Sequence, residues 1–163
     1  MIFHSMMALF PDISSGENLP KLSLSNPSEE ILPVKDSELE ELLLLIEQGE
    51  KVTFREVELV YVGEKYITDV NKEYLNRDYV TDIISFRYDE DEANKAIEGT
   101  LFCCAPRIRE QSIEQGTAEL HEFFRIFIHG LLHLAGYDDQ TENDKKTMTR
   151  LENKYLNLLG LES

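Results

Sequence analysis

Residues 129–139 read HGLLHLAGYDD and complete a long apolar stretch whose hydrophobic residues recur with the period of a helix. On such a helix His129 and His133 share one face, where they can bind a single ion. Gly136 can take the left-handed conformation that ends a helix, and the chain can then turn back to bring Asp139 to the same ion. Three protein ligands with one position left for water are typical of a catalytic zinc site.

The same stretch is also compatible with a protein that binds no metal. A histidine in an apolar helix is usually a core or surface residue with a hydrogen-bond partner, and a turn containing Asp138 and Asp139 forms without an ion. Two histidines at ligand spacing, followed by a helix stop and a carboxylate within reach, favour the metal site. Because both aspartates are available, the third ligand is the least determined member of the set.

Composition limits the class of protein. The chain has 163 residues, of which 42% are hydrophobic, and this fits one domain with its own core. It lacks a run of about 18 apolar residues and the basic start and cleavage site of a signal peptide, so neither a membrane span nor export is expected. Cys103 and Cys104 are adjacent and would point to opposite faces of a strand, so we expect no disulfide and a cytoplasmic location.

The formal net charge of −16 opposes binding to nucleic acid and to anionic membranes. An RNA-binding function would therefore need a local basic surface, or a partner that supplies one. The acidity also has a simpler interpretation, which is solubility.

The hydrophobic pattern predicts an α+β fold, with a small mixed four-stranded β-sheet flanked by helices and the metal site at the end of a central helix. Strand character is found in residues 21–25, 56–62, 83–88 and 96–105. Helices are expected to begin at the Ser37–Glu40 capping box, at Thr68, at Pro106, at Thr117 and at Thr141. Residues 1–20 show no clear period and are expected to form a flexible tail before a single domain over residues 21–163.

Residues 129–139 resemble the signature H-G-x-L-H-L-x-G-Y-D-H of the YbeY family of bacterial endoribonucleases at every position except the last. A second family pattern, L-N-x-x-Y-R-x-x-x-x-P-T-D-[VI]-[LI]-S-F, is similar to residues 70–86, with matches at Asn71, Tyr74 and residues 81–86. Gly99 corresponds to the glycine of the family's G-D-I segment. The two patterns in this order and at this distance are specific.

The resemblance implies a single-strand-specific, metal-dependent endoribonuclease. Such an enzyme acts in ribosomal RNA maturation, at the 3′ end of 16S ribosomal RNA, and in ribosome quality control. Its partners would be single-stranded or ribosomal RNA and the small ribosomal subunit. Its cofactor would be one Zn²⁺ ion, although other divalent transition metals tolerate similar ligands. The implied metal ligands are His129, His133 and Asp139, and Asp139 stands where the family has a third histidine.

Other departures from the family pattern bear on catalysis. Leu75 stands where the family has an arginine, whose guanidinium suits phosphate recognition. Val80 replaces a proline, and Thr100 replaces an aspartate. A carboxylate at Asp139 would also lower the net charge of the metal centre and make its bound water less acidic. These changes leave a non-catalytic, ribosome-associated binding protein as an alternative.

Candidate RNA contacts are few. Arg77 lies close to the missing arginine and is predicted, with Arg107, to bind substrate. Lys146, Arg150 and Lys154 form a basic stripe along the last helix, which a solvated helix face explains equally well.

A zinc metalloprotease with metzincin-like ligand spacing is the second alternative. Those enzymes carry a glutamate after the first histidine, and here that position is Gly130, which argues against peptide hydrolysis. No general base is identified by the sequence, although Asp138 and Glu142 are near the candidate ligands.

Overall fold

The computed structural model describes residues 20–88 and 96–161, so the expected N-terminal tail lies outside it except for its last residue. The strands are β1 (Leu22–Ser25), β2 (Thr53–Val62), β3 (Ile83–Arg87) and β4 (Ala96–Cys104). They form one sheet in the order β1-β2-β4-β3, in which β1, β2 and β4 are parallel and β3 runs antiparallel to β4. The predicted mixed four-stranded sheet is confirmed.

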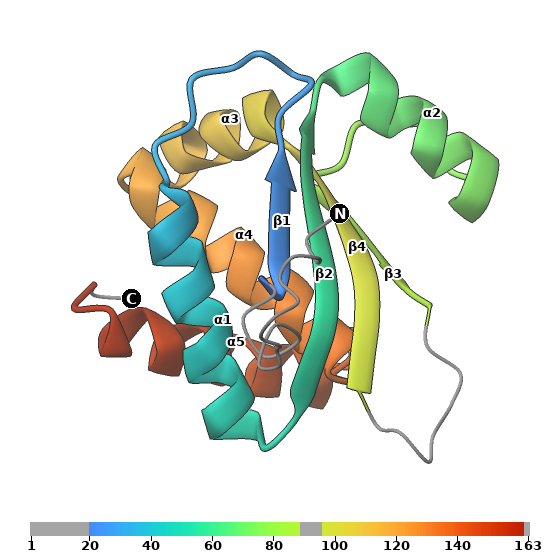
Figure 1. The fold of residues 1–163 in the computed structure, drawn as a ribbon. Helices are drawn as coiled ribbons and strands as arrows, with labels where there is room; N and C mark the ends of the chain where they lie inside the picture. Colours follow the sequence, from blue (N-terminus) through green and yellow to red (C-terminus); the bar gives the residue numbers. More distant parts are fainter. Residues whose placement is uncertain (1–19, 89–95, 162–163) are drawn as a thin grey trace, which may run out of the picture.

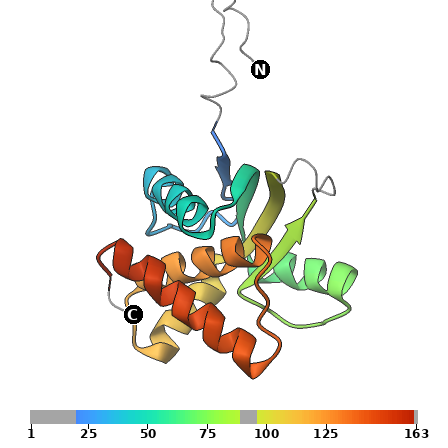
Figure 2. The ribbon, with the colours of Figure 1, turned by 90° about the horizontal axis from the view of Figure 1, so that it is seen from below.

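Five helices cover the sheet unequally. They are α1 (Asp36–Glu50), α2 (Glu64–Leu75), α3 (Ala105–Gln115), α4 (Glu119–Leu134) and α5 (Glu142–Leu158). Helices α1, α3, α4 and α5 lie on one face, and α2 alone lies on the other (Figures 1 and 2). No helix in the described ranges has the length and apolar character needed to cross a membrane. The α+β class predicted from the pattern is confirmed.

Alternation along the strands divides the core between these two faces. Leu59 and Cys103 join the large cluster beneath α1, α3, α4 and α5, while Val60 and Cys104 join the smaller cluster beneath α2. Both cysteines are buried free thiols. The adjacent cysteines therefore face opposite sides of β4, as their position in a strand requires.

Three predicted helix caps were wrong, and that of α4 is Ala118 rather than Thr117. Helix α1 is capped at Lys35, whose backbone N–H donates to the Glu38 carboxylate at 2.9 Å, rather than at Ser37. Thr68 lies inside α2, where its hydroxyl donates to the carbonyl of Glu64 at 2.8 Å. A threonine can bond either to an N-terminal amide or to the carbonyl one turn earlier, so its type alone does not fix a helix start.

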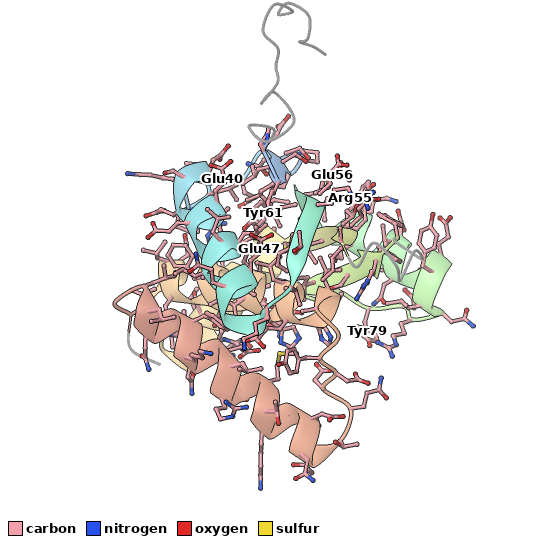
Figure 3. All side chains as sticks on the ribbon, turned by 60° about the horizontal axis from the view of Figure 1, so that its bottom comes forward. Glu40, Glu47, Arg55, Glu56, Tyr61 and Tyr79 are labelled. Atoms are coloured by element: carbon pink, nitrogen blue, oxygen red, sulfur yellow. The ribbon has the colours of Figure 1, made fainter. Side chains whose placement is uncertain are left out.

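A buried carboxylate ties α1 to the sheet. Glu47 lies between α1 and β2 (Figure 3), where it accepts hydrogen bonds from the Phe54 amide and the Lys21 ammonium, each at 2.7 Å. Its side chain is only 12% exposed, so this ion pair is shielded from water on one side. The contact fixes the turn from α1 into β2.

Helix α4 approaches the sheet closely because two glycines leave room for it. A Cβ on Gly130 would lie 2.6 Å from Cδ1 of Ile83 and 3.0 Å from Cδ1 of Leu101. A Cβ on Gly99 would lie 2.5 Å from the carbonyl oxygen of Phe86 and 2.8 Å from Cδ2 of Leu134. The last turns of α4, which carry both histidines, are therefore packed directly against β3 and β4.

Replacing Gly99 by serine tests this close packing. The added Cβ meets a backbone oxygen that cannot rotate away, so we expect Gly99→Ser to lower the free energy of unfolding by about 1–3 kcal/mol. Chemical denaturation measures the change. Gly63→Ser is the matched control, because a Cβ there meets no atom within 4 Å and serine suits the helix cap. Equal stability of the two variants would contradict the packing described.

Candidate metal centre

The structure brings His129, His133 and Asp139 together. The two imidazole Nε2 atoms are 3.0 Å apart, and Oδ2 of Asp139 lies 3.4 Å from Nε2 of His129 and 3.5 Å from Nε2 of His133. In a tetrahedral zinc site with bonds of about 2.0–2.1 Å, neighbouring ligand atoms are about 3.3–3.4 Å apart. The three donor atoms therefore fit one triangular face of such a site, and they leave a fourth position open.

The turn after α4 selects which aspartate reaches the site. Gly136 has a φ of 109°, in the region that favours glycine, and its N–H donates to the carbonyl of His133 at 3.0 Å. The chain then reverses and places Asp139 beside the histidines. Asp138 is exposed, and its carboxylate accepts the N–H of Asp139 at 2.8 Å. The turn therefore brings the carboxylate of Asp139 within 3.4–3.5 Å of both Nε2 atoms.

Hydrogen bonds at Nδ1 orient both imidazoles. Nδ1 of His133 bonds to the carbonyl oxygen of Tyr137 at 2.9 Å, and Nδ1 of His129 bonds to the Glu152 carboxylate at 2.6 Å. Both partners are acceptors, so each Nδ1 carries a proton and each Nε2 is directed towards the other ring. Two unprotonated Nε2 atoms 3.0 Å apart would repel each other, so either a shared proton or a metal ion must lie between them. The donor set therefore fits a bound metal ion.

A buried ion network supports His129 from behind. Glu152 also binds Arg125 at 3.2 Å, and Arg125 binds Glu122 through Nε at 3.0 Å and a second nitrogen at 2.5 Å. Glu122 is fully buried and the Glu152 side chain is only 4% exposed. Two carboxylates surround one guanidinium, so the network carries a net negative charge. That charge favours a cation at His129.

The same surroundings shift the pKa values of the network. Burial lowers the pKa of His129, but the hydrogen bond and charge of Glu152, with the charges of Asp139 and Asp82, outweigh burial and raise it overall. Burial also lowers the pKa of Arg125, but the hydrogen bonds and charges of Glu122 and Glu152 outweigh burial and raise it overall. A metal ion at His129 must therefore compete with a proton that the pocket holds more firmly than usual.

A hydrogen bond to Glu50, at the end of α1, ties down the turn that precedes Asp139. The Glu50 carboxylate accepts the hydroxyl of Tyr137 at 2.5 Å and also that of Tyr155 on α5. The hydrogen bond to Glu50 raises the pKa of Tyr137, so its hydroxyl stays protonated as a donor. Because the carbonyl of Tyr137 also bonds to His133, one residue links α1, the turn and a candidate ligand.

The candidate ligands open into a pocket of about 490 Å³. The side chains of His129, His133 and Asp139 are 18%, 25% and 41% exposed, so a solute in the pocket can reach them. The rest of its wall comes from the α2–β3 loop, β3 and the turn after α4, and includes Leu75, Arg77, Thr81, Asp82, Ile83, Ser85, Arg87 and Asp138. The two segments that carry the sequence patterns thus meet at one pocket.

The predicted basic residues are placed differently. Arg77 lines the pocket, whereas Arg107 lies outside its lining and its guanidinium binds Glu110 and Glu114 on α3. Lys146 and Arg150 line a separate, open hollow on α5 that also contains Glu142. Lys146 and Arg150 therefore lie outside the lining of the pocket that holds the candidate ligands.

Sequence reasoning missed the residues behind the ligands. Glu122 and Glu152 each stand within an apolar helical pattern, and an acid at a core position is the signal that could have identified them. Arg87 was missed because it ends a strand and no pattern in the neighbouring sequence distinguishes it. In the structure its guanidinium donates to the carbonyl of Leu134 at 3.0 Å, at the end of α4.

Comparisons with known proteins agree with the arrangement. The family model for Endoribonuclease YbeY matches residues 25–160. The solution structure of TM1509 from Thermotoga maritima has the same fold, with a TM-score of 0.51 and 22% sequence identity over 85% of this chain and 91% of that one.

Curated relatives extend the similarity to most of the chain. An Endoribonuclease YbeY from Chloroherpeton thalassium is 36% identical over 74% of this chain and 84% of its own. Another, from Chlorobium phaeobacteroides, is 33% identical over 85% of this chain and 96% of its own. The resemblance seen in the two sequence patterns is confirmed, and the chain belongs to the YbeY family.

Proposed function

We propose that this chain is a metal-dependent endoribonuclease that cuts single-stranded RNA. In this proposal one domain over residues 21–163 acts in the cytoplasm on ribosomal RNA of the small subunit, maturing the 3′ end of 16S ribosomal RNA and serving ribosome quality control. Relatives that carry the name Endoribonuclease YbeY support the activity. The observation that carries it is the triangle of donors from His129, His133 and Asp139 at an open pocket.

Zinc is the metal that this donor set suits best. Two imidazole nitrogens and one carboxylate oxygen with tetrahedral spacing are ordinary zinc ligands, and other divalent transition metals accept them as well. A zinc ion with an open position polarises a phosphoryl oxygen and lowers the pKa of its water towards about 7.

The chain's own residues would position the RNA and move protons. Arg77 lines the pocket and can donate to a phosphate, a role that Leu75 at the family's arginine position cannot fill. Asp82 is a half-buried carboxylate in the same wall, held by the Gln111 amide at 3.2 Å, and we assign it as the candidate general base. Arg107 stays a weaker candidate because two carboxylates already bind its guanidinium.

The two alternatives have less support. A protease of the metzincin type needs a glutamate where this chain has Gly130, and that position faces Ile83 and Leu101 in the core with no room for a side chain. A non-catalytic binding protein would not need the converging donors of His129, His133 and Asp139 at the open pocket.

Removing one ligand tests the activity and separates it from proteolysis. We expect zinc-loaded protein to cut single-stranded RNA and to leave casein intact. His133→Ala should reduce RNA cleavage more than about 100-fold, because changes behind a ligand alone cost about 10–100-fold. His121→Ala, on the same helix but outside the site, is the control. Cleavage of casein alone, or RNA cleavage that survives in His133→Ala, would contradict the proposal.

The carboxylate behind His129 should tune metal affinity. Glu152→Gln removes the charge that faces Nδ1 of His129, and we expect zinc to bind about 10–100-fold more weakly. Glu122→Gln is the matched control, since it removes an equal charge from the same guanidinium without contacting the imidazole. Competition with a chelating dye gives both affinities. Equal losses in the two variants would show that the contact with His129 has no special role.

The phosphate contact predicts a change in salt dependence. Arg77→Ala should weaken binding of single-stranded RNA and reduce the slope of log affinity against log salt by about one. Arg55→Ala removes the same charge from an exposed ion pair with Glu98, outside the pocket lining, and should leave the slope unchanged. Binding at several salt concentrations measures the slopes. Identical slopes for the two variants would remove Arg77 from the phosphate site.

A further inference from the structure

A second hollow, of about 260 Å³, lies between α2 and the outer face of the sheet and is walled almost entirely by aromatic rings. Its lining consists of Tyr66, Val70, Tyr74, Phe86, Tyr88 and Phe102. Its three tyrosines are more than half exposed, at 51% for Tyr66, 61% for Tyr74 and 56% for Tyr88. Rings left open to water in this way are not required by the core beneath them.

Regular structure places the rings together. Tyr66, Val70 and Tyr74 recur every four residues on α2 and so share the helix face that looks onto the sheet. The ring centroids of Tyr74 and Phe86 are 5.4 Å apart, and those of Phe86 and Phe102 are 6.0 Å apart, each in an edge-to-face arrangement. Edge-to-face contacts therefore join these rings, and their open surfaces border the hollow, which we call the aromatic slot.

Strand β3 is the wall shared by this aromatic slot and the metal pocket. Ser85 and Arg87 line the metal pocket, while Phe86 lines the aromatic slot, as the alternation of side chains along a strand predicts. Tyr88 follows directly after the strand and lines the slot, and Ile84 also reaches the metal pocket. The end of α2 repeats this division, with Tyr74 in the slot and the next residue in the metal pocket. The two hollows are thus adjacent across one edge strand of the sheet.

We propose that the aromatic slot binds a nucleobase of the single-stranded RNA, next to the phosphate held in the metal pocket, by stacking on the rings of Tyr66 and Tyr74. The inference rests on the proposed function and names a base-binding subsite for it. Stacking tolerates any base, since every base has a π face. The slot's volume is below the roughly 300–1,000 Å³ of drug-sized ligand pockets, which suits a single flat heterocycle.

Charge also favours a base over a protein partner. A chain of net charge −16 gains little from general attraction to RNA, so contacts that do not depend on charge must contribute to binding. A protein partner would need a surface of about 800 Å² on this side, whereas the slot is a small concavity beside the metal pocket. Only a base is at once small, flat and joined to a phosphate.

Binding of a labelled single-stranded oligouridylate with a cleavage-resistant backbone to the zinc-loaded protein, measured by fluorescence anisotropy, tests the subsite. Because Tyr74 is largely exposed, its variants should fold. We expect Tyr74→Ala to weaken binding about tenfold or more. Tyr74→Phe keeps the ring and should bind like the parent, whereas Tyr74→Leu keeps apolar bulk without a π face and should resemble Tyr74→Ala. An oligonucleotide with abasic sites should bind all four proteins equally.

The outcomes separate failure of the base-binding subsite from failure of the proposed function. Equal affinity of the parent and Tyr74→Ala for the oligouridylate would overturn the subsite. A loss of affinity in Tyr74→Ala that persists with the abasic oligonucleotide would also overturn it, because the ring would then act without a base. If the zinc-loaded parent still cuts RNA in that case, the proposed function stands and only the base-binding inference fails. If the parent neither binds nor cuts single-stranded RNA, the proposed function fails and the subsite falls with it.

Discussion

The need to pair every polar group on a buried helix governs this structure. Helix α4 is apolar around most of its circumference and lies between the sheet and the other helices, yet it carries Glu122, Arg125, His129 and His133. A polar group withdrawn from water costs free energy unless it is hydrogen-bonded. Each of these four side chains has found a partner on α4 itself, on α5 or in the turn that follows. At the candidate metal centre the two Nε2 atoms face each other at 3.0 Å, where a metal ion can take the place of a shared proton.

The buried charges explain why the site favours a cation. Two carboxylates around Arg125 leave one negative charge beside His129, and Asp139 adds another in front of it. A family site with three histidines would lack the second charge. The carboxylate at Asp139 therefore strengthens attraction for the metal and, by the same electrostatics, makes water in the open position less acidic. An acidic enzyme of this kind would bind RNA through few cations and through stacking.

The sequence could predict the sheet, the central helix and the three residues that converge, because each depends on local spacing and hydrophobic period. The role of Glu152 depends instead on how α5 packs across α4, which is information that no local pattern contains. Thr68 misled the prediction of a helix start because its hydroxyl bonds backwards within α2. Arg107 stood near the expected pocket in sequence, but α3 directs its guanidinium towards Glu110 and Glu114. Long-range packing, rather than residue type, decided these positions.

X-ray absorption spectroscopy of the zinc-loaded protein shows directly whether His129 and His133 bind the ion together. We expect light-atom ligands at about 2.0–2.1 Å, with the multiple-scattering signal of two imidazoles. A spectrum without imidazole scattering, or one identical in every respect for the parent and for a variant lacking both His129 and His133, would contradict this expectation.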